Sequence, residues 1–232
     1  MSFVNGPRIV TDGLVLALDA ADKNSYVGSG TTWTDLSGNG VNGTLLNSPT
    51  FNSANGGGIV FNGTNQYSDF GNLSSYINTT TITFSVWLKW SATGVNKTIL
   101  GNEPNFASGT LSNPVGFGLR QRSANNYWLS LGANTPAMID YTPTITTTNW
   151  HNVLVTLNGT TATFYINGNS VSSAASNYTV GTTTSFQIGR NVSAANEYWG
   201  GSMALFQLYN RALSATEISQ NYNATKSRFN LR

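Results

Sequence analysis

The chain has 232 residues, of which 9% are charged and 12% aromatic, and its formal net charge is +2. This charge is too small to favour nucleic-acid binding, and the aromatic content excludes a disordered chain. Cysteine is absent, which excludes disulfides and thiolate metal sites. No apolar run reaches the length of a membrane span, and the first residues lack the apolar core of a signal peptide. We therefore expect neither nucleic acid nor a membrane as a partner.

Strand patterns follow one another along the chain, separated by turns rich in Gly, Asn and Ser. We expect strands at 14–18, 59–61, 67–70, 81–90, 115–120, 127–131, 150–157, 161–166, 170–172, 186–189 and 204–209. The clearest is 81–90, where apolar residues alternate with Thr83, Ser85 and Lys89, so that the two kinds lie on opposite faces. Trp87 breaks the alternation, and we expect its ring to pack on a second layer.

Two Asn-Gly pairs, Asn158-Gly159 and Asn167-Gly168, separate the strand patterns at 150–157, 161–166 and 170–172. Asn-Gly is a strong hairpin signal because both residues tolerate positive φ at the central positions of a turn. These pairs predict a meander of antiparallel strands. Many short strands with regular turns indicate two packed antiparallel sheets.

One short helix is predicted near the C-terminus. Ser214 and Glu217 have the spacing of a capping box, in which each side chain accepts a hydrogen bond from a free backbone N–H of the first turn. Leu213 and Ile218 have the spacing of a hydrophobic staple. We therefore expect a helix that starts near Ala215 and closes an otherwise all-β domain.

No Pro- or Ser-rich linker divides the chain, so we expect one domain. Its expected parts are an N-terminal arm at 1–13, a β-sandwich at 14–225 and a C-terminal tail at 226–232. In the tail, Phe229 and Leu231 alternate with Arg228, Asn230 and Arg232, which is typical of a strand.

The order of motifs resembles the laminin-G-like branch of the concanavalin A-like lectin/glucanase superfamily. The matching residues are 35–40 (DLSGNG), 42–45 (NGTL), 60–63 (VFNG) ahead of Tyr67, 84–88 (FSVWL), 150–153 (WHNV), 164–168 (FYING), 188–190 (IGR) and 208–214 (LYNRALS). The resemblance implies a two-sheet antiparallel jelly-roll sandwich. Within the superfamily, residues 9–20 followed by 30–35 resemble structural proteins of marine tailed phages.

The superfamily includes glycoside hydrolases, which need two carboxylates at a fixed separation. In the glucanase branch these lie on one strand as Glu-x-Asp-x-x-Glu, a pattern that this chain lacks. His151 is the single histidine, and it follows Trp150 as in the structural signature of the family. We therefore expect no enzymatic activity and no catalytic residue.

The resemblance also raises the question of calcium, which laminin-G-like domains often bind through carboxylates and backbone carbonyls. Asp35, Asn39 and Asp69 are the candidate ligands. However, many relatives carry an acidic residue before the tyrosine, where this chain has Gln66. Asx-turns made by Asp35 and Asn39 are the favoured alternative, so no cofactor is expected.

Exposed aromatic rings could stack on sugars, and Trp33 and the pairs Tyr127-Trp128 and Tyr198-Trp199 lie in or beside expected loops. The candidates are Trp33, Trp128 and Trp199. Burial in the core is the more common position of Trp. At the ends of the chain, Phe3, Arg228, Phe229, Leu231 and Arg232 are candidates for contact with a neighbouring subunit through an added strand. The alternative is that Phe229 and Leu231 fold back onto their own sandwich.

Together these features lead us to expect a non-enzymatic virion structural protein, a capsid decoration or accessory subunit. Its expected partners are the major capsid protein or copies of itself, and its expected location is the virion, after synthesis in the host cytoplasm. The alternative is a carbohydrate-binding adhesin that recognises a host surface glycan.

Overall fold

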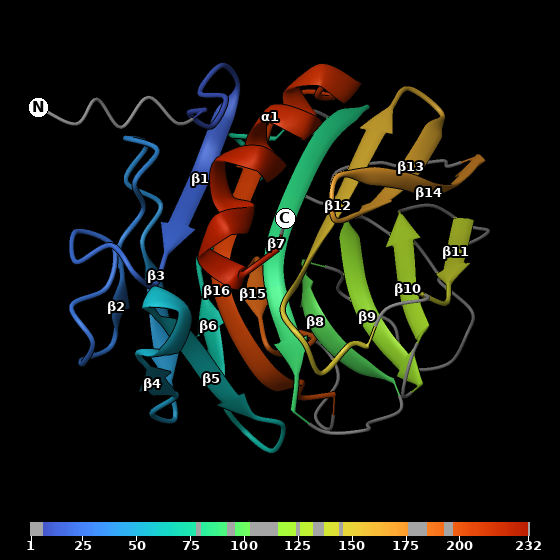
Figure 1. Ribbon diagram of the computed structural model, residues 1–232. Helices are drawn as coiled ribbons and strands as arrows, with labels where there is room; N and C mark the ends of the chain where they lie inside the picture. Colours follow the sequence, from blue (N-terminus) through green and yellow to red (C-terminus); the bar gives the residue numbers. More distant parts are fainter. Residues whose placement is uncertain are drawn as a thin grey trace, which may run out of the picture.

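The structure, a computed structural model, describes residues 7–77, 80–91, 96–102, 116–123, 126–131, 137–143, 146–175, 185–192 and 197–231. In these residues the chain forms two eight-stranded antiparallel sheets packed as a sandwich (Figure 1). The first sheet comprises β1 (Leu14–Asp19), β4 (Thr50–Asn52), β5 (Gly58–Asn62), β7 (Thr81–Trp90), β12 (His151–Asn158), β13 (Thr161–Ile166), β14 (Asn169–Ala175) and β16 (Gly200–Tyr209). The second comprises β2 (Thr32–Trp33), β3 (Gly43–Leu46), β6 (Tyr67–Asp69), β8 (Lys97–Gly101), β9 (Phe117–Ser123), β10 (Asn126–Leu131), β11 (Ala137–Tyr141) and β15 (Gln187–Ile188).

The first sheet is organised around β16. One edge of β16 pairs with β7, and its other edge is shared by β5 near Gly200 and β1 near Tyr209. The path through this sheet is β14-β13-β12-β7-β16-β5-β4. The second sheet has the order β11-β10-β9-β8-β15-β6-β3-β2. Because half of the strand pairs join strands that are not consecutive in the sequence, each sheet collects residues from both halves of the chain.

Aromatic side chains fill the space between the sheets. Phe84 stacks on Phe117 with 5.3 Å between the ring centroids, and Phe186 stacks on Phe206 with the same distance between centroids. All four are fully buried. Each buried phenylalanine contributes about 1.5–3 kcal/mol relative to an exposed ring. The expected all-β sandwich with a single C-terminal helix is confirmed.

The strongly patterned strands lie where we expect them, and β7 and β13 have the expected bounds. Five strands have no counterpart in our expectation: β2, β3, β4, β8 and β11. The turn between β13 and β14 has Asn167 and Gly168 at its centre, both with positive φ, as predicted. The turn between β12 and β13 is shifted by one residue, because Asn158 pairs with Thr161 and leaves Gly159 as the first central position.

Helix α1 (Ala215–Thr225) lies across the outer face of the first sheet, as Figure 1 shows. The predicted capping box is present: Glu217 N donates to Ser214 Oγ at 3.3 Å, and Ser214 N donates to Glu217 Oε2 at 2.8 Å. Leu213 and Ile218 are buried in one cluster with Val10 and Tyr209. No helix among the described residues is long and apolar enough to span a membrane.

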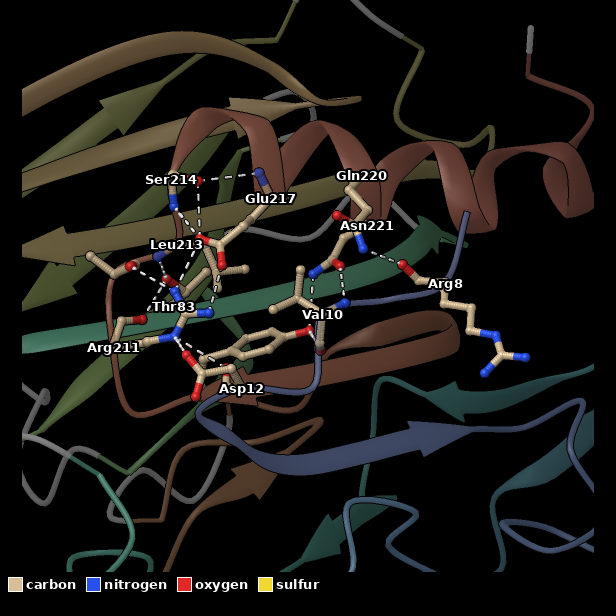
Figure 2. A network of polar contacts seen from close by, with 12 residues as sticks. Arg8, Val10, Asp12, Thr83, Arg211, Leu213, Ser214, Glu217, Gln220 and Asn221 are labelled. Atoms are coloured by element: carbon tan, nitrogen blue, oxygen red, sulfur yellow. Dashed lines mark hydrogen bonds and ion pairs between the residues drawn. The ribbon is translucent and has the colours of Figure 1, made fainter. Parts of the chain in front are cut away.

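The described part of the expected N-terminal arm is held by the same helix (Figure 2). Val10 N donates to Asn221 Oδ1 at 2.8 Å, and Gln220 Nε2 donates to the Arg8 carbonyl at 2.7 Å. Arg211 bridges the two segments, since it pairs with Asp12 at 2.9 Å and with Glu217 at 2.6 Å. The arm and the helix therefore stabilise each other.

This network predicts a specific acid sensitivity. The Arg211 guanidinium, followed by the Ser214 backbone N–H, lowers the pKa of Glu217 from 4.5 to about 2. A carboxyl whose pKa is lower in the folded state contributes stability above its unfolded value, and this contribution is lost as the pH falls from about 4.5 towards about 2. The difference in melting temperature between the wild type and Glu217→Gln should therefore shrink on acidification from neutral pH. A constant difference would show that the carboxylate charge contributes nothing.

The C-terminal tail differs from our expectation. Residues Lys226–Phe229 form a 3-10 helix and not a strand. Phe229 is 5% exposed, and its ring stacks on Trp87 with 4.1 Å between centroids. Arg228 pairs with Asp19 at 2.6 Å, and Leu231 packs on the same apolar cluster as Phe229. The strand prediction is wrong because this ring gains more by covering Trp87 than an extended tail could gain in water.

Phe229 and Leu231 thus pack on their own chain, as our alternative had it. Arg228, which we expected to contact a neighbouring subunit, also has its ion pair within the chain. The other two candidates, Phe3 and Arg232, lie outside the described residues. Trp87 has the second-layer contact that its break in the β7 pattern predicts.

Candidate functional site

The outer face of the second sheet carries an unusual set of aromatic and charged side chains. Strand alternation places Leu45, Ser68 and Ile188 towards the core and Tyr67, Asp69 and Gln187 outwards. Arg120 of β9 pairs in register with Trp128 of β10 and with Thr98 of β8 on that same outer face. Two groups of residues result, one centred on Arg190 and one on Glu197.

The first group, here called the Arg190 patch, consists of Tyr67, Asp69, Gln187, Arg190 and Tyr198. The Arg190 guanidinium lies 4.2 Å from the centroid of the Tyr67 ring, and the rings of Tyr67 and Tyr198 are 6.2 Å apart. Arg190 Nε donates to Gln187 Oε1 at 2.9 Å, and Gln187 Nε2 donates to Asp69 Oδ2 at 2.5 Å. Gln187 is buried and the other four are half-buried, so each of these four side chains is partly open to solvent.

The second group anchors the segment that carries Tyr198. Glu197 Oε2 lies 2.5 Å from Arg120 Nη2 and accepts a hydrogen bond from Thr98 Oγ1 at 3.0 Å. Arg120 also lies 5.9 Å from the centroid of the Trp128 ring, and Arg122 lies 5.0 Å from it. Because the Arg120 side chain is 1% exposed, this ion pair fixes Glu197, and with it the adjacent Tyr198, on the sheet.

A family model described as "Concanavalin A-like lectin/glucanases superfamily" matches residues 62–219, more than half of the chain. The chain belongs to this superfamily. The match begins just before Tyr67 and contains the whole Arg190 patch. No curated protein matches the chain, so the expected resemblance to tailed-phage virion proteins stays a prediction.

Several solved structures resemble the chain in fold. A botulinum neurotoxin DC binding domain "in complex with SialylT" has a TM-score of 0.67 and 15% identity over 93% of this chain and 52% of that one. Trypanosoma rangeli sialidase in complex with sialic acid has a TM-score of 0.68 and 16% identity, over 93% of this chain and 33% of the sialidase. Domain 4 of AbnA, an arabinanase from Geobacillus stearothermophilus, was solved in complex with arabinotriose. It has a TM-score of 0.65 and 16% identity, over 90% of this chain and 98% of that domain. The chain thus spans about half of the toxin domain and about a third of the sialidase, and this likeness shows the fold alone.

The three tryptophans proposed to stack on sugars differ in position. Trp33 and Trp199 are fully buried, so their assignment to sugar stacking is wrong. Trp199 packs on Phe61 and lies against Gly201, where no room exists for a Cβ. Trp128 is 9% exposed and lies on the outer face beneath Arg122.

The calcium candidates implied by the superfamily resemblance form hydrogen bonds within the chain. Asp35 accepts from the backbone N–H groups of Ala17, Ser37 and Val41, and the contact with Ser37 is the expected Asx-turn. Asn39 Nδ2 donates to the Val15 carbonyl at 2.9 Å. Asp69 lies apart from both, in the Arg190 patch. Among the described residues, no three His, Cys, Asp or Glu side chains come together as a metal site.

His151 is buried, and both of its ring nitrogens have partners. Nδ1 lies 2.8 Å from the Asn149 carbonyl and so donates its proton there, while Nε2 accepts from the Tyr127 hydroxyl. Burial lowers the pKa of His151 to about 4. This neutral imidazole links β12 to β10 across the core, which agrees with the structural role expected for it.

Our sequence reasoning did not identify Tyr67, Arg190 and Tyr198 as site residues. Tyr67 and Arg190 appeared only as parts of family motifs, and Tyr198 only as the neighbour of Trp199. Successive strand residues point to opposite faces, so Tyr198 faces outwards because Trp199 faces inwards. The sequence shows that Tyr198 and Trp199 are adjacent and so point to opposite faces, but it does not show which of the two rings faces outwards.

Proposed function

We propose that this chain is a carbohydrate-binding domain and that sugars bind on the Arg190 patch. The observation that carries the proposal is the pair of half-buried rings of Tyr67 and Tyr198, 6.2 Å apart and flanked by Arg190. Two of the structural neighbours are described as complexes with sugars, sialic acid and arabinotriose, which supports a lectin-like role for the fold.

The chemistry of the patch suits a sugar. Ring faces contact the C–H surface of a pyranose, and a small number of oriented polar groups fix its hydroxyls. Asp69 holds the Gln187 amide in one orientation and Gln187 accepts from Arg190 Nε, so the Arg190 guanidinium is placed before a ligand arrives. Such pre-organisation lowers the entropic cost of binding.

The proposal is tested by screening the chain on a glycan array and measuring the affinity of the best glycan for single variants. Tyr67→Ala and Tyr198→Ala should each weaken binding about fivefold to tenfold, because each removes one stacking face. Tyr76→Ala is the matched control, since Tyr76 is 37% exposed on a different loop and should leave affinity unchanged. Equal affinities of all three variants, with melting temperatures near that of the wild type, would place the sugar elsewhere.

We further propose that binding is not followed by hydrolysis. Hydrolysis requires two carboxyl groups about 5–9.5 Å apart that are free to act on one bond. Each acidic side chain that the structure describes accepts a hydrogen bond or forms an ion pair within its own chain, so none is free to act on a bound sugar. They are Asp12, Asp19, Asp22, Asp35, Asp69, Glu197 and Glu217.

Incubation with a broad panel of polysaccharides should therefore release no reducing ends. Glu197→Gln and Asp69→Asn serve as controls for contamination. Release of sugar by the wild type that disappears in either variant would contradict the proposal.

The expected role as a virion subunit stays a prediction, together with its expected partners, the major capsid protein or further copies of the chain. A glycan partner is part of the proposed function, and its location on a host surface stays a prediction.

A further inference from the structure

Arg190 differs from the other buried or half-buried arginines in its charge balance. Arg120 pairs with Glu197, Arg211 with Asp12 and Glu217, and Arg228 with Asp19. Within the described residues no carboxylate lies within ion-pair distance of Arg190. Partial burial of a charge costs free energy unless a counter-charge compensates it. The fold therefore keeps one guanidinium on its outer face without a counter-ion of its own.

The contacts of Arg190 leave the outer end of its guanidinium available. Its Nε–H is held firmly by Gln187, at 2.9 Å. Its Nη1 and Nη2 atoms have only long contacts, of 3.4 Å, to Tyr198 Oη and the Val192 carbonyl. Both exceed the usual range for an N–H···O hydrogen bond, which ends near about 3.2 Å. The Nη donors are thus oriented but weakly occupied.

The orientation of this group is set from two sides. The Tyr67 ring supports the flat face of the guanidinium at 4.2 Å. Asp69 fixes the Gln187 amide by accepting from its Nε2, which leaves Gln187 Oε1 directed at Arg190 Nε. A guanidinium fork held in this way matches the geometry of a carboxylate or a sulfate, to which it can donate two parallel hydrogen bonds.

We propose that the Arg190 patch selects acidic sugars, with Arg190 binding a carboxylate or sulfate group while the rings of Tyr67 and Tyr198 contact the sugar. This inference rests on the proposed function and adds the ligand class to it. Asp69 and Gln187 are positioning residues in this arrangement, because they act on the ligand only through Arg190.

The test is a glycan array in which each core oligosaccharide is printed in three forms, neutral, carboxylated and sulfated, followed by titration of the best triplet. The acidic form should bind about tenfold more tightly than its neutral counterpart, because a hydrogen bond to a charged group contributes more free energy than one to a neutral group. A tenfold change in affinity corresponds to about 1.4 kcal/mol. Added salt should reduce this preference. The comparison of carboxylated with sulfated forms identifies the source of the anion.

Three variants separate recognition from packing. Arg190→Gln should bring acidic and neutral forms to nearly equal affinity, Arg190→Lys should keep a reduced preference, and Arg8→Gln should change nothing. Arg8 is an exposed arginine whose side chain points away from the network drawn in Figure 2. Wild-type binding that is equal for the forms of every triplet would overturn the inference and leave the proposed function intact. Absence of binding to any glycan would overturn both.

Discussion

Replacing Phe229 with alanine should destabilise the chain by about 3 kcal/mol, although Phe229 stands only three residues from the C-terminus. The ring is 5% exposed and lies between Trp87, at 4.1 Å, and Trp150, at 5.1 Å between centroids. Truncation of a buried phenylalanine typically costs about 3–5 kcal/mol, and the value falls at the low end where the chain can close over the gap. Leu231 is half-buried on the same cluster and can move towards the gap, so we expect the low end of this range.

Urea denaturation followed by tryptophan fluorescence measures this effect, because Trp87 and Trp150 are the reporters that the ring covers. Leu231→Ala is the control: this side chain is half-buried on the same cluster and should cost less. Deletion of residues 226–232 should cost at least as much as Phe229→Ala, since it also removes the Arg228–Asp19 ion pair. An unchanged midpoint for the deletion would mean that the tail does not cover its own sandwich in solution.

The second large effect concerns Glu197. Glu197→Gln should cost about 2–3 kcal/mol, because it removes the carboxylate that lies 2.5 Å from the buried Arg120 guanidinium. Breaking one side of a buried ion pair typically costs about 3–5 kcal/mol. The expected value is lower because the Glu197 side chain is 18% exposed and water can replace part of the interaction.

Asp12→Asn is the matched control, because Asp12 also pairs with an arginine but its side chain is 85% exposed. Exposed pairs contribute about 0–1 kcal/mol. Thermal and urea denaturation of both variants at neutral pH give the comparison. If Glu197→Gln cost no more than Asp12→Asn, the outer face of the second sheet would be more hydrated than the structure indicates.

The features that sequence reasoning predicted correctly depend on local pattern. The alternation in β7 and the capping box of α1 are encoded within about ten residues each, and both occur at the predicted positions. The break in alternation at Trp87 correctly indicated a second layer. The missed strands β2, β3 and β4 are short and rich in Gly, Thr and Asn, so their local strand preference is weak. They form because they pair with other strands: β2 with β3, β4 with β5, and β3 also with β6.

The conformation of the C-terminal tail depends on a contact that is distant in the sequence. Alternation of apolar and polar residues over six or seven positions is typical of a strand. The same residues can instead form a short 3-10 helix that buries Phe229 on Trp87. The choice depends on a partner more than 100 residues away in the sequence, which periodicity cannot reveal.

The candidate site was harder to predict because it depends on three segments meeting. Strand β6 provides Tyr67, β15 and the residues after it provide Gln187 and Arg190, and the segment before β16 provides Tyr198. Only the order of strands in the sheet brings these three segments together. The proposed stacking residues Trp33 and Trp199 carried the right chemistry but face the core. Each aromatic pair in the sequence predicts one buried ring and one outward ring, and register decides which is which.

The central claim is that sugars bind on the Arg190 patch, and chemical-shift mapping by NMR tests it most directly. The labelled chain is titrated with the glycan that binds best on the array, and the perturbed amides are placed on the structure. The account predicts the largest shifts at Tyr67, Gln187, Arg190 and Tyr198, with none around Tyr76 or along α1. Saturable shifts confined to another surface, with the amides of the patch unperturbed, would contradict it.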